Sequence, residues 1–196
     1  MARPVYRGDT PTAVTKLKDA FWQLLGSMNY SHITVKKLTA AAGVNPNTFY
    51  YHFATMDDLA KAALKEVQLS ELPLLLMSRF TTGSVPAGAL PDPGSLEERW
   101  QKIRLFLRSD STVLQQYIYD LMEQFWLEAI GVEKTDLSRE EYLELIFVLN
   151  GAVSVIRQQD REYDASFLET LPERPLGRGI LQTLDELMKK YKKDGP

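Results

Sequence analysis

Hydrophobic residues recur every three or four positions along most of the chain, which is the spacing with which an α-helix buries one face. The pattern is clearest from Thr112 to Ile130. Similar patterns predict helices over Ala13 to Met28, Leu96 to Arg108 and Arg139 to Gln159, and a last helix that includes Ile180 to Tyr191. An all-α protein is therefore expected.

Residues 33 to 59 predict two short helices joined by a tight turn. Thr34 suits the cap of the first helix, since its side chain can accept from a backbone N–H of the first turn. Gly43 ends that helix, because glycine takes the left-handed conformation without a Cβ penalty. Asn45 suits the cap of the second helix and Pro46 its first position.

The second helix of this pair presents aromatic and polar residues outward. Phe49 and Phe53 are four positions apart and are expected to be buried together. The positions left largely outward are Pro46, Asn47, Thr48, Tyr50, Tyr51 and His52. Most of these side chains form hydrogen bonds without carrying a negative charge. The helix therefore suits contact with phosphates or base edges.

The segment from Gly43 to Phe53, G-V-N-P-N-T-F-Y-Y-H-F, resembles the DNA-binding domain of the TetR (tetracycline repressor) family. The similarity extends from Thr12 to Leu64, and its most specific residues are Gly43, Val44, Thr48, Tyr50, His52 and Phe53. Two positions depart from the family pattern. Met56 stands where many members have a phosphate-binding lysine, and Asn47 where a small residue is common, so no family contact is transferred to either position.

The resemblance implies an N-terminal three-helix DNA-binding domain, residues 1–56, and a helical effector-binding and dimerisation domain, residues 57–196. Within the second domain, residues 57–72 are expected to form a connecting helix that ends before Pro73. Residues 81–94, with three prolines and three glycines, predict a flexible loop. Movement of the connecting helix is the switching device that the family implies.

The resemblance and the outward face of the second helix together predict which residues contact DNA, with Asn47 predicted from its position alone. A homodimer is expected to place two recognition helices in successive major grooves of a near-palindromic operator. The residues expected at phosphates are Thr34, Lys36, Tyr50 and His52, and those expected at base edges are Pro46, Asn47, Thr48 and Tyr51. Lys16 and Lys18 lie near the start of the first helix, which approaches the DNA backbone in the family, and Arg3 and Arg7 lie in the preceding tail.

Charge is divided unevenly along the chain, whose net charge is −3. Residues 1 to 53 contain six basic and two acidic side chains, a net charge of +4. The remaining residues contain 17 basic and 24 acidic side chains, a net charge of −7. This division suits a basic end that faces phosphates and an acidic body that stays away from them, although a solvated surface can also acquire it by chance.

For the helical body, the resemblance implies a small apolar or amphipathic effector and a dimer interface built from the last two helices. Gly151, Ala152 and Ser154 would permit close approach of two copies. Burial within one subunit is the alternative for all of these residues. The candidate effector-binding residues are Trp100, Tyr117, Met122, Phe125, Trp126, Phe147 and Asn150, of which Asn150 is an amide flanked by apolar residues.

The sequence thus predicts a transcription regulator, a ligand-responsive repressor in its most specific form. The chain has no cysteine and its two histidines, His32 and His52, lie near the N-terminus, so no metal site, cofactor or catalytic centre is expected. The longest apolar run, Leu145 to Leu149, is too short to cross a membrane, and a cytoplasmic protein is expected. A helix-turn-helix adaptor without operator binding is the alternative, and an enzyme is a more remote one.

Overall fold

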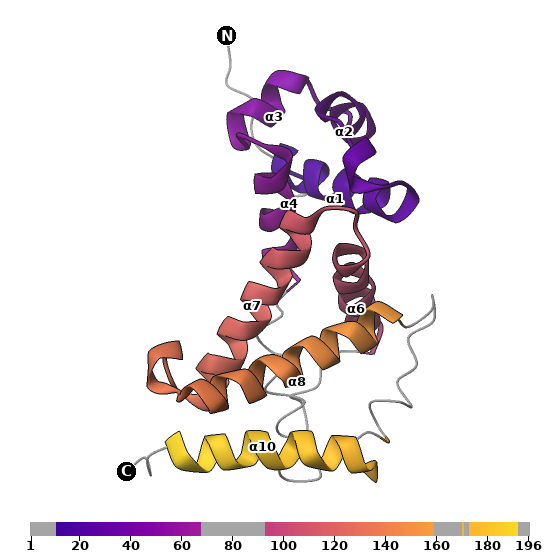
Figure 1. The fold of residues 1–196 in the computed structure, drawn as a ribbon. Helices are drawn as coiled ribbons and strands as arrows, with labels where there is room; N and C mark the ends of the chain where they lie inside the picture. The colour runs from indigo at the N-terminus through magenta and orange to yellow at the C-terminus, as the bar shows by residue number, and fades with distance from the viewer. Residues whose placement is uncertain (1–10, 68–92, 159–169, 171–172, 192–196) are drawn as a thin grey trace. The chain divides into compact units, whose positions relative to one another are not determined.

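The computed structural model describes residues 11–67, 93–158, 170 and 173–191. Every regular element among these residues is a helix (Figure 1), which confirms the predicted all-α fold. The chain forms two compact units: an N-terminal unit of residues 1–66 and 109–114, and a C-terminal unit of residues 67–108 and 115–196. The functional boundary after residue 56 stays a prediction.

The N-terminal unit is a small helical domain built on one core. Its elements are α1 (Ala13–Ser27), the 3₁₀ helix η1 (Tyr30–His32), α2 (Val35–Ala42), α3 (Pro46–His52) and α4 (Met56–Lys65). Helix α1 packs against α2, α3 and α4. The core contains Leu17 and Phe21 of α1 and one fully buried side chain from each of the other three helices, namely Leu38, Phe49 and Leu59.

Helix α4 begins with a strong signal and ends earlier than predicted. Thr55 and Asp58 form a capping box, in which each side chain bonds the backbone N–H of the other. The connecting helix, expected over residues 57–72, is helical only as far as Lys65 among the described residues. Glu66 makes an ion pair with Lys18 of α1. A carboxylate opposes the dipole at a helix C-terminus, and this ion pair gives it a partner.

The C-terminal unit is organised around α8. Its elements are α6 (Pro93–Leu107), α7 (Thr112–Ile130), the 3₁₀ helix η2 (Lys134–Asp136), α8 (Arg139–Gln158) and α10 (Pro175–Tyr191). Helix α8 packs against both α6 and α10. The core of this unit is formed by Trp126, Ile130, Leu137, Leu145, Leu149, Leu184 and Leu187. The first turn of α7 groups with the N-terminal unit.

Prolines set the start of two of these helices. Helix α6 begins at Pro93, inside the predicted loop of residues 81–94, so that part of the loop prediction is wrong. The rest of the loop, and residues 68–72 of the connecting segment, lie outside the described residues. Pro175 begins α10, because proline fits the first turn of a helix, where its missing N–H is not needed.

Polar contacts fasten the ends of α8 and α10 to each other. The Lys190 ammonium lies 2.6 Å from Oε1 of Glu141, and the Tyr191 hydroxyl donates to Oε2 of Glu141 at 2.8 Å. The hydrogen bond from Lys190, followed by that from the Ser138 backbone, lowers the pKa of Glu141 to about 2. No helix among the described residues is long and apolar enough to cross a membrane.

Candidate nucleic-acid interface

The turn between α2 and α3 forms as its sequence predicts. Gly43 has φ of 63° and is left-handed, a conformation that costs other residues energy. The Val44 N–H then donates to the Thr39 carbonyl at 3.0 Å, which satisfies a carbonyl at the end of α2. At the start of α3, Asn45 Oδ1 accepts from the Asn47 N–H at 2.8 Å. Both helix ends at the turn are therefore capped.

Two aromatic residues on the buried side of α3 anchor this helix in the core. Phe49 and Phe53 are buried, and their ring centroids lie 5.9 Å apart. The Tyr50 ring packs edge-on against Phe49 at 5.3 Å between centroids. One face of α3 is thus fixed in the core, which sets the direction of the opposite face.

That opposite face is exposed. Tyr51 is 84% exposed and Tyr50 63% exposed, large values for aromatic side chains. Of the eight predicted DNA-contacting residues, Thr48 is half-buried, and the exposed ones are Thr34, Lys36, Pro46, Asn47, Tyr50, Tyr51 and His52. These residues come from α2, α3 and the cap that precedes α2.

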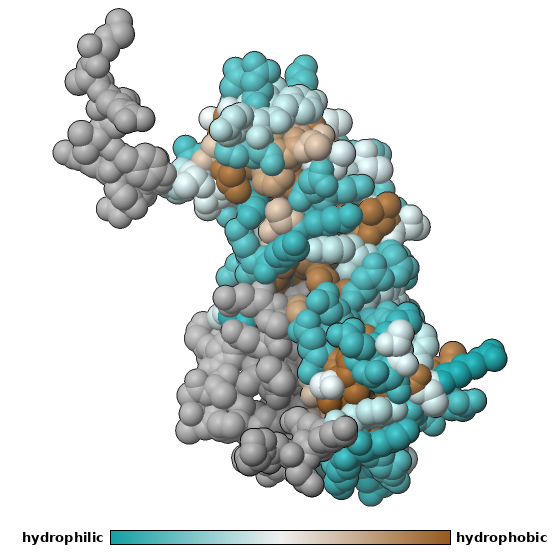
Figure 2. All heavy atoms as spheres, turned by 90° about the vertical axis from the view of Figure 1, so that its left-hand side faces the viewer, coloured by the Kyte–Doolittle hydropathy of each residue, from teal (hydrophilic) through white to brown (hydrophobic). Residues whose placement is uncertain are grey.

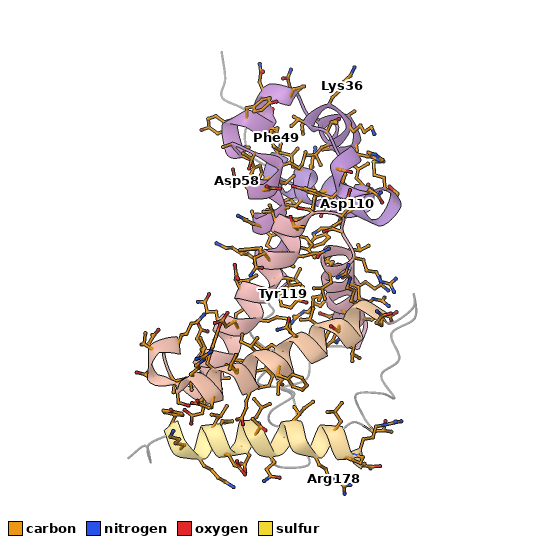
Figure 3. All side chains as sticks on the ribbon, in the orientation of Figure 1. Lys36, Phe49, Asp58, Asp110, Tyr119 and Arg178 are labelled. Atoms are coloured by element: carbon orange, nitrogen blue, oxygen red, sulfur yellow. The ribbon has the colours of Figure 1, made fainter. Side chains whose placement is uncertain are left out.

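The start of α2 contributes polar groups beside this face. Thr34 Oγ1 accepts from the Lys37 N–H at 3.3 Å, which leaves its hydroxyl hydrogen available as a donor. Lys36 extends outward from α2 (Figure 3), whereas the Lys37 ammonium donates to the His32 carbonyl at 3.0 Å. Lys36 is therefore the lysine of α2 that is suited to an external anion.

Residues 20 to 56 contain no aspartate or glutamate. The next two acids are used internally, since Asp57 accepts from the Tyr30 hydroxyl and Asp58 belongs to the capping box of α4. On the face shown in Figure 2, the surface of the described residues is mostly polar, with small separate apolar areas. A polyanion approaching α2 and α3 therefore meets no carboxylate from these helices.

The lysines predicted on α1 have different surroundings from those expected. Lys18 is engaged by Glu66 and its side chain is only 12% exposed, so the expectation that Lys18 faces the DNA backbone is wrong. Lys16 is half-buried. Arg3 and Arg7 of the preceding tail lie outside the described residues.

The candidate effector-binding residues do not share one environment. Trp100 and Trp126 are buried, and Tyr117, Met122 and Phe125 are half-buried. Phe147 and Asn150 lie on the exposed face of α8. The amide of Asn150 donates to the Ile146 carbonyl at 2.8 Å, so Asn150, although flanked by apolar residues in sequence, is an exposed amide with a partner in its own helix. Effector binding by these residues stays a prediction.

Two contacts of η1, the 3₁₀ helix that precedes α2, were not predicted from the sequence. The Tyr30 hydroxyl of η1 donates to Asp57 of α4, and burial, followed by this hydrogen bond, raises the pKa of Tyr30. The Ser31 N–H of η1 points at the carboxylate of Asp110, which lies 79 positions away in sequence. Such long-range pairs leave no periodic signal in a sequence.

A comparison with protein families identifies the same region. Residues 19–63 match the family model of bacterial regulatory proteins, tetR family. The chain is also similar to the crystal structure of the TetR family repressor AlkX from Dietzia sp. strain DQ12-45-1b, implicated in biodegradation of n-alkanes. That match has 18% sequence identity, covers 92% of this chain and 100% of the other, and has a TM-score of 0.44. No curated protein matches the chain.

The family match spans α2, the turn at Gly43 and α3, together with most of α1 and α4. It includes the exposed face of α3 and the stretch without carboxylates. The N-terminal domain is therefore a DNA-binding domain of the TetR family, the domain of a DNA-binding transcriptional regulator.

Proposed function

We propose that the protein is a ligand-responsive repressor that binds a near-palindromic operator as a homodimer. The observation that carries the proposal is the exposed face of α2 and α3. This face presents polar and aromatic side chains, and residues 20 to 56 contain no aspartate or glutamate. In a symmetric dimer, two such helices fit successive major grooves about 34 to 36 Å apart.

The exposed residues divide into two roles by their chemistry and position. Lys36, Tyr50 and His52 are expected to contact phosphates, as is the Thr34 hydroxyl. Helix α3 begins at Pro46, and the first turn of a recognition helix is the part that reaches base edges. The residues expected at bases are Pro46, Asn47, Thr48 and Tyr51.

Homodimer formation is supported by an exposed apolar stripe on α8. Leu143 is 54% exposed and Phe147 76% exposed. They lie four positions apart, and Gly151 follows at the same interval, so the three share one helix face. A Cβ atom added at Gly151 would meet nothing within 4 Å in the chain itself. A second copy of this face would cover the two apolar side chains, with Gly151 allowing close approach.

Response to an effector is the third part of the proposed function. It is supported by the aromatic content of the C-terminal unit, where Trp100 and Trp126 are buried on α6 and α7. A small apolar or amphipathic molecule is the expected ligand. Such a ligand should raise the melting temperature and lower operator affinity, because a ligand stabilises the conformation that it prefers.

The test begins with selection of genomic DNA fragments bound by the purified protein, followed by titration of the enriched sequence at about 150 mM salt. Tyr50→Ala and His52→Ala should weaken binding across all sequences while the helical content stays unchanged. Tyr50→Phe isolates the hydroxyl group. Gln124→Ala, at an exposed position of α7, is the matched control and should bind as the wild type does.

Two results would overturn the proposal. If Tyr50→Ala and His52→Ala bind the operator as tightly as the wild type, the contact assignment is wrong. If no fragment is enriched and no salt-dependent binding occurs, the adaptor alternative replaces operator binding. Assays of substrate turnover address the enzyme alternative separately.

A further inference from the structure

The 3₁₀ helix η1 lacks a cap from its own sequence. Asn29 occupies the cap position, but its side chain makes no capping hydrogen bond. Within η1, the His32 N–H donates to the Asn29 carbonyl and the Ile33 N–H to the Tyr30 carbonyl. The N–H groups of Tyr30 and Ser31 come before these bonds, and the first N–H groups of any helix need outside acceptors.

Asp110 supplies that acceptor from a distant part of the chain. The Ser31 nitrogen lies 3.3 Å from Oδ1 and 3.4 Å from Oδ2 of Asp110, so the carboxylate faces the start of η1. Hydrogen bonds from the Ser31 side chain, the Ser31 backbone and the Tyr30 backbone lower the pKa of Asp110. An aspartate at this place is the usual helix cap, here provided by another segment.

The capped helix leads directly to the DNA-contacting surface. Ile33 is buried, and Thr34 is the cap of α2. The Lys37 ammonium of α2 donates to the carbonyl of His32. Helix η1 is therefore attached to the start of α2 by its chain and by a side chain.

Asp110 lies between α6 and α7 (Figure 3), in a turn that is itself well anchored. The Arg108 N–H continues the hydrogen bonding of α6 to the Arg104 carbonyl, and the Ser111 hydroxyl accepts from the Leu114 N–H at the start of α7. The turn is thus short and fastened on both sides.

We propose that Asp110 is a positioning residue for operator binding: it caps η1 and thereby fixes the segment that places Thr34 and Lys36. This role rests on the proposed operator binding. Its charge would repel DNA, so the hydrogen-bond acceptor, not the charge, is the property that matters.

The test compares Asp110→Ala with Asp110→Asn in the full-length protein. Asparagine keeps a capping oxygen and removes the charge, whereas alanine removes both. Asp120→Ala and Asp120→Asn are the matched controls. Asp120 is exposed on α7, and among the described residues its carboxylate accepts a hydrogen bond from Gln116 of the same helix. Two quantities are measured: amide hydrogen exchange at Tyr30 and Ser31 in the free protein, and operator affinity.

Asp110→Ala should speed exchange at both amides and weaken operator binding roughly three- to tenfold, within the range by which losing a helix cap changes an equilibrium. Asp110→Asn should restore slow exchange and bind at least as tightly as the wild type. The Asp120 variants should change neither quantity. Equal affinities for Asp110→Ala and Asp110→Asn would overturn the proposal, as would unchanged amide exchange in Asp110→Ala.

The two levels of inference fail in different ways. A wild-type protein that binds no operator refutes the proposed function, and the positioning role with it. A wild-type protein that binds normally, with Asp110→Ala binding equally well, refutes the positioning role alone.

Discussion

Replacing Phe147 by alanine should break the homodimer and leave the monomer folded. Phe147 is 76% exposed on α8, so little of its ring contributes to packing within one chain. Alanine also favours the helical conformation more than phenylalanine, by about 0.5 kcal/mol. The stability of the isolated monomer should therefore stay the same or rise slightly.

The size of the effect on dimerisation follows from the exposed fraction. Complete burial of a phenylalanine side chain stabilises by roughly 1.5 to 3 kcal/mol. Three quarters of this, about 1 to 2 kcal/mol, is still available to each exposed ring. A symmetric dimer contains two such rings, so their loss should cost about 2 to 4 kcal/mol, which corresponds to roughly a 30- to 700-fold weaker dimer.

Sedimentation velocity over a series of protein concentrations measures this change as a shift in the dimer dissociation constant. Circular dichroism and thermal unfolding, at concentrations where the variant is monomeric, check that α8 remains folded. Tyr51→Ala is the matched control, because it removes an aromatic ring that is 84% exposed on a different surface, α3.

The reasoning is refuted if Phe147→Ala dimerises as tightly as the wild type, since the exposed stripe would then lie outside the interface. It is also refuted if Tyr51→Ala weakens the dimer as much, because the effect would not be specific to α8. A wild-type protein that is monomeric at every concentration excludes the homodimer itself.

Three further predictions concern stability and salt dependence. Gly43→Ala should lower the free energy of unfolding in urea by about 1 to 2 kcal/mol, because φ of 63° is strained for alanine. Gly26 lies in α1 with open space around the position of a Cβ atom, so Gly26→Ala should raise the same free energy by up to ~1 kcal/mol. Lys36→Gln should reduce the slope of log affinity against log salt by about one per subunit, and Lys18→Gln should leave the slope unchanged because its ammonium is held in an ion pair. Glu141→Gln should destabilise the protein at neutral pH, and the difference should vanish as the pH falls from 4.5 toward about 2, since a depressed folded-state pKa stabilises only above that pKa; a difference that persists at pH 2 would contradict this.

The elements that the sequence predicted well are those specified by local signals. Thr34, Gly43 and Asn45 mark helix ends through their own side chains or their own φ, and the structure places the caps there. Helix α7 has the predicted bounds, Thr112 to Ile130, because its hydrophobic residues repeat at helical spacing over its whole length.

The features that the sequence did not predict depend on pairs far apart in the chain. The end of α4 at Lys65 involves Glu66, whose partner is on α1. The exposure of Phe147 and Asn150 was not evident, since α8 is apolar over much of its circumference and periodicity alone does not say which face a partner covers. The cap on η1 comes from a residue 79 positions away.

The charge of the N-terminal unit shows why position matters more than net charge for DNA binding. Its described residues carry six lysines and five carboxylates, a nearly neutral balance that would not by itself indicate a DNA-binding surface. Yet the carboxylates of Asp57, Asp58, Glu66 and Asp110 each accept a hydrogen bond or form an ion pair within the unit. None of the five lies between residues 20 and 56. The carboxylates therefore hold η1 and α4 in place, while α2 and α3 are left without negative charge. Affinity from phosphate contacts should accordingly be modest, and most discrimination between operators should come from the polar and aromatic groups of α3.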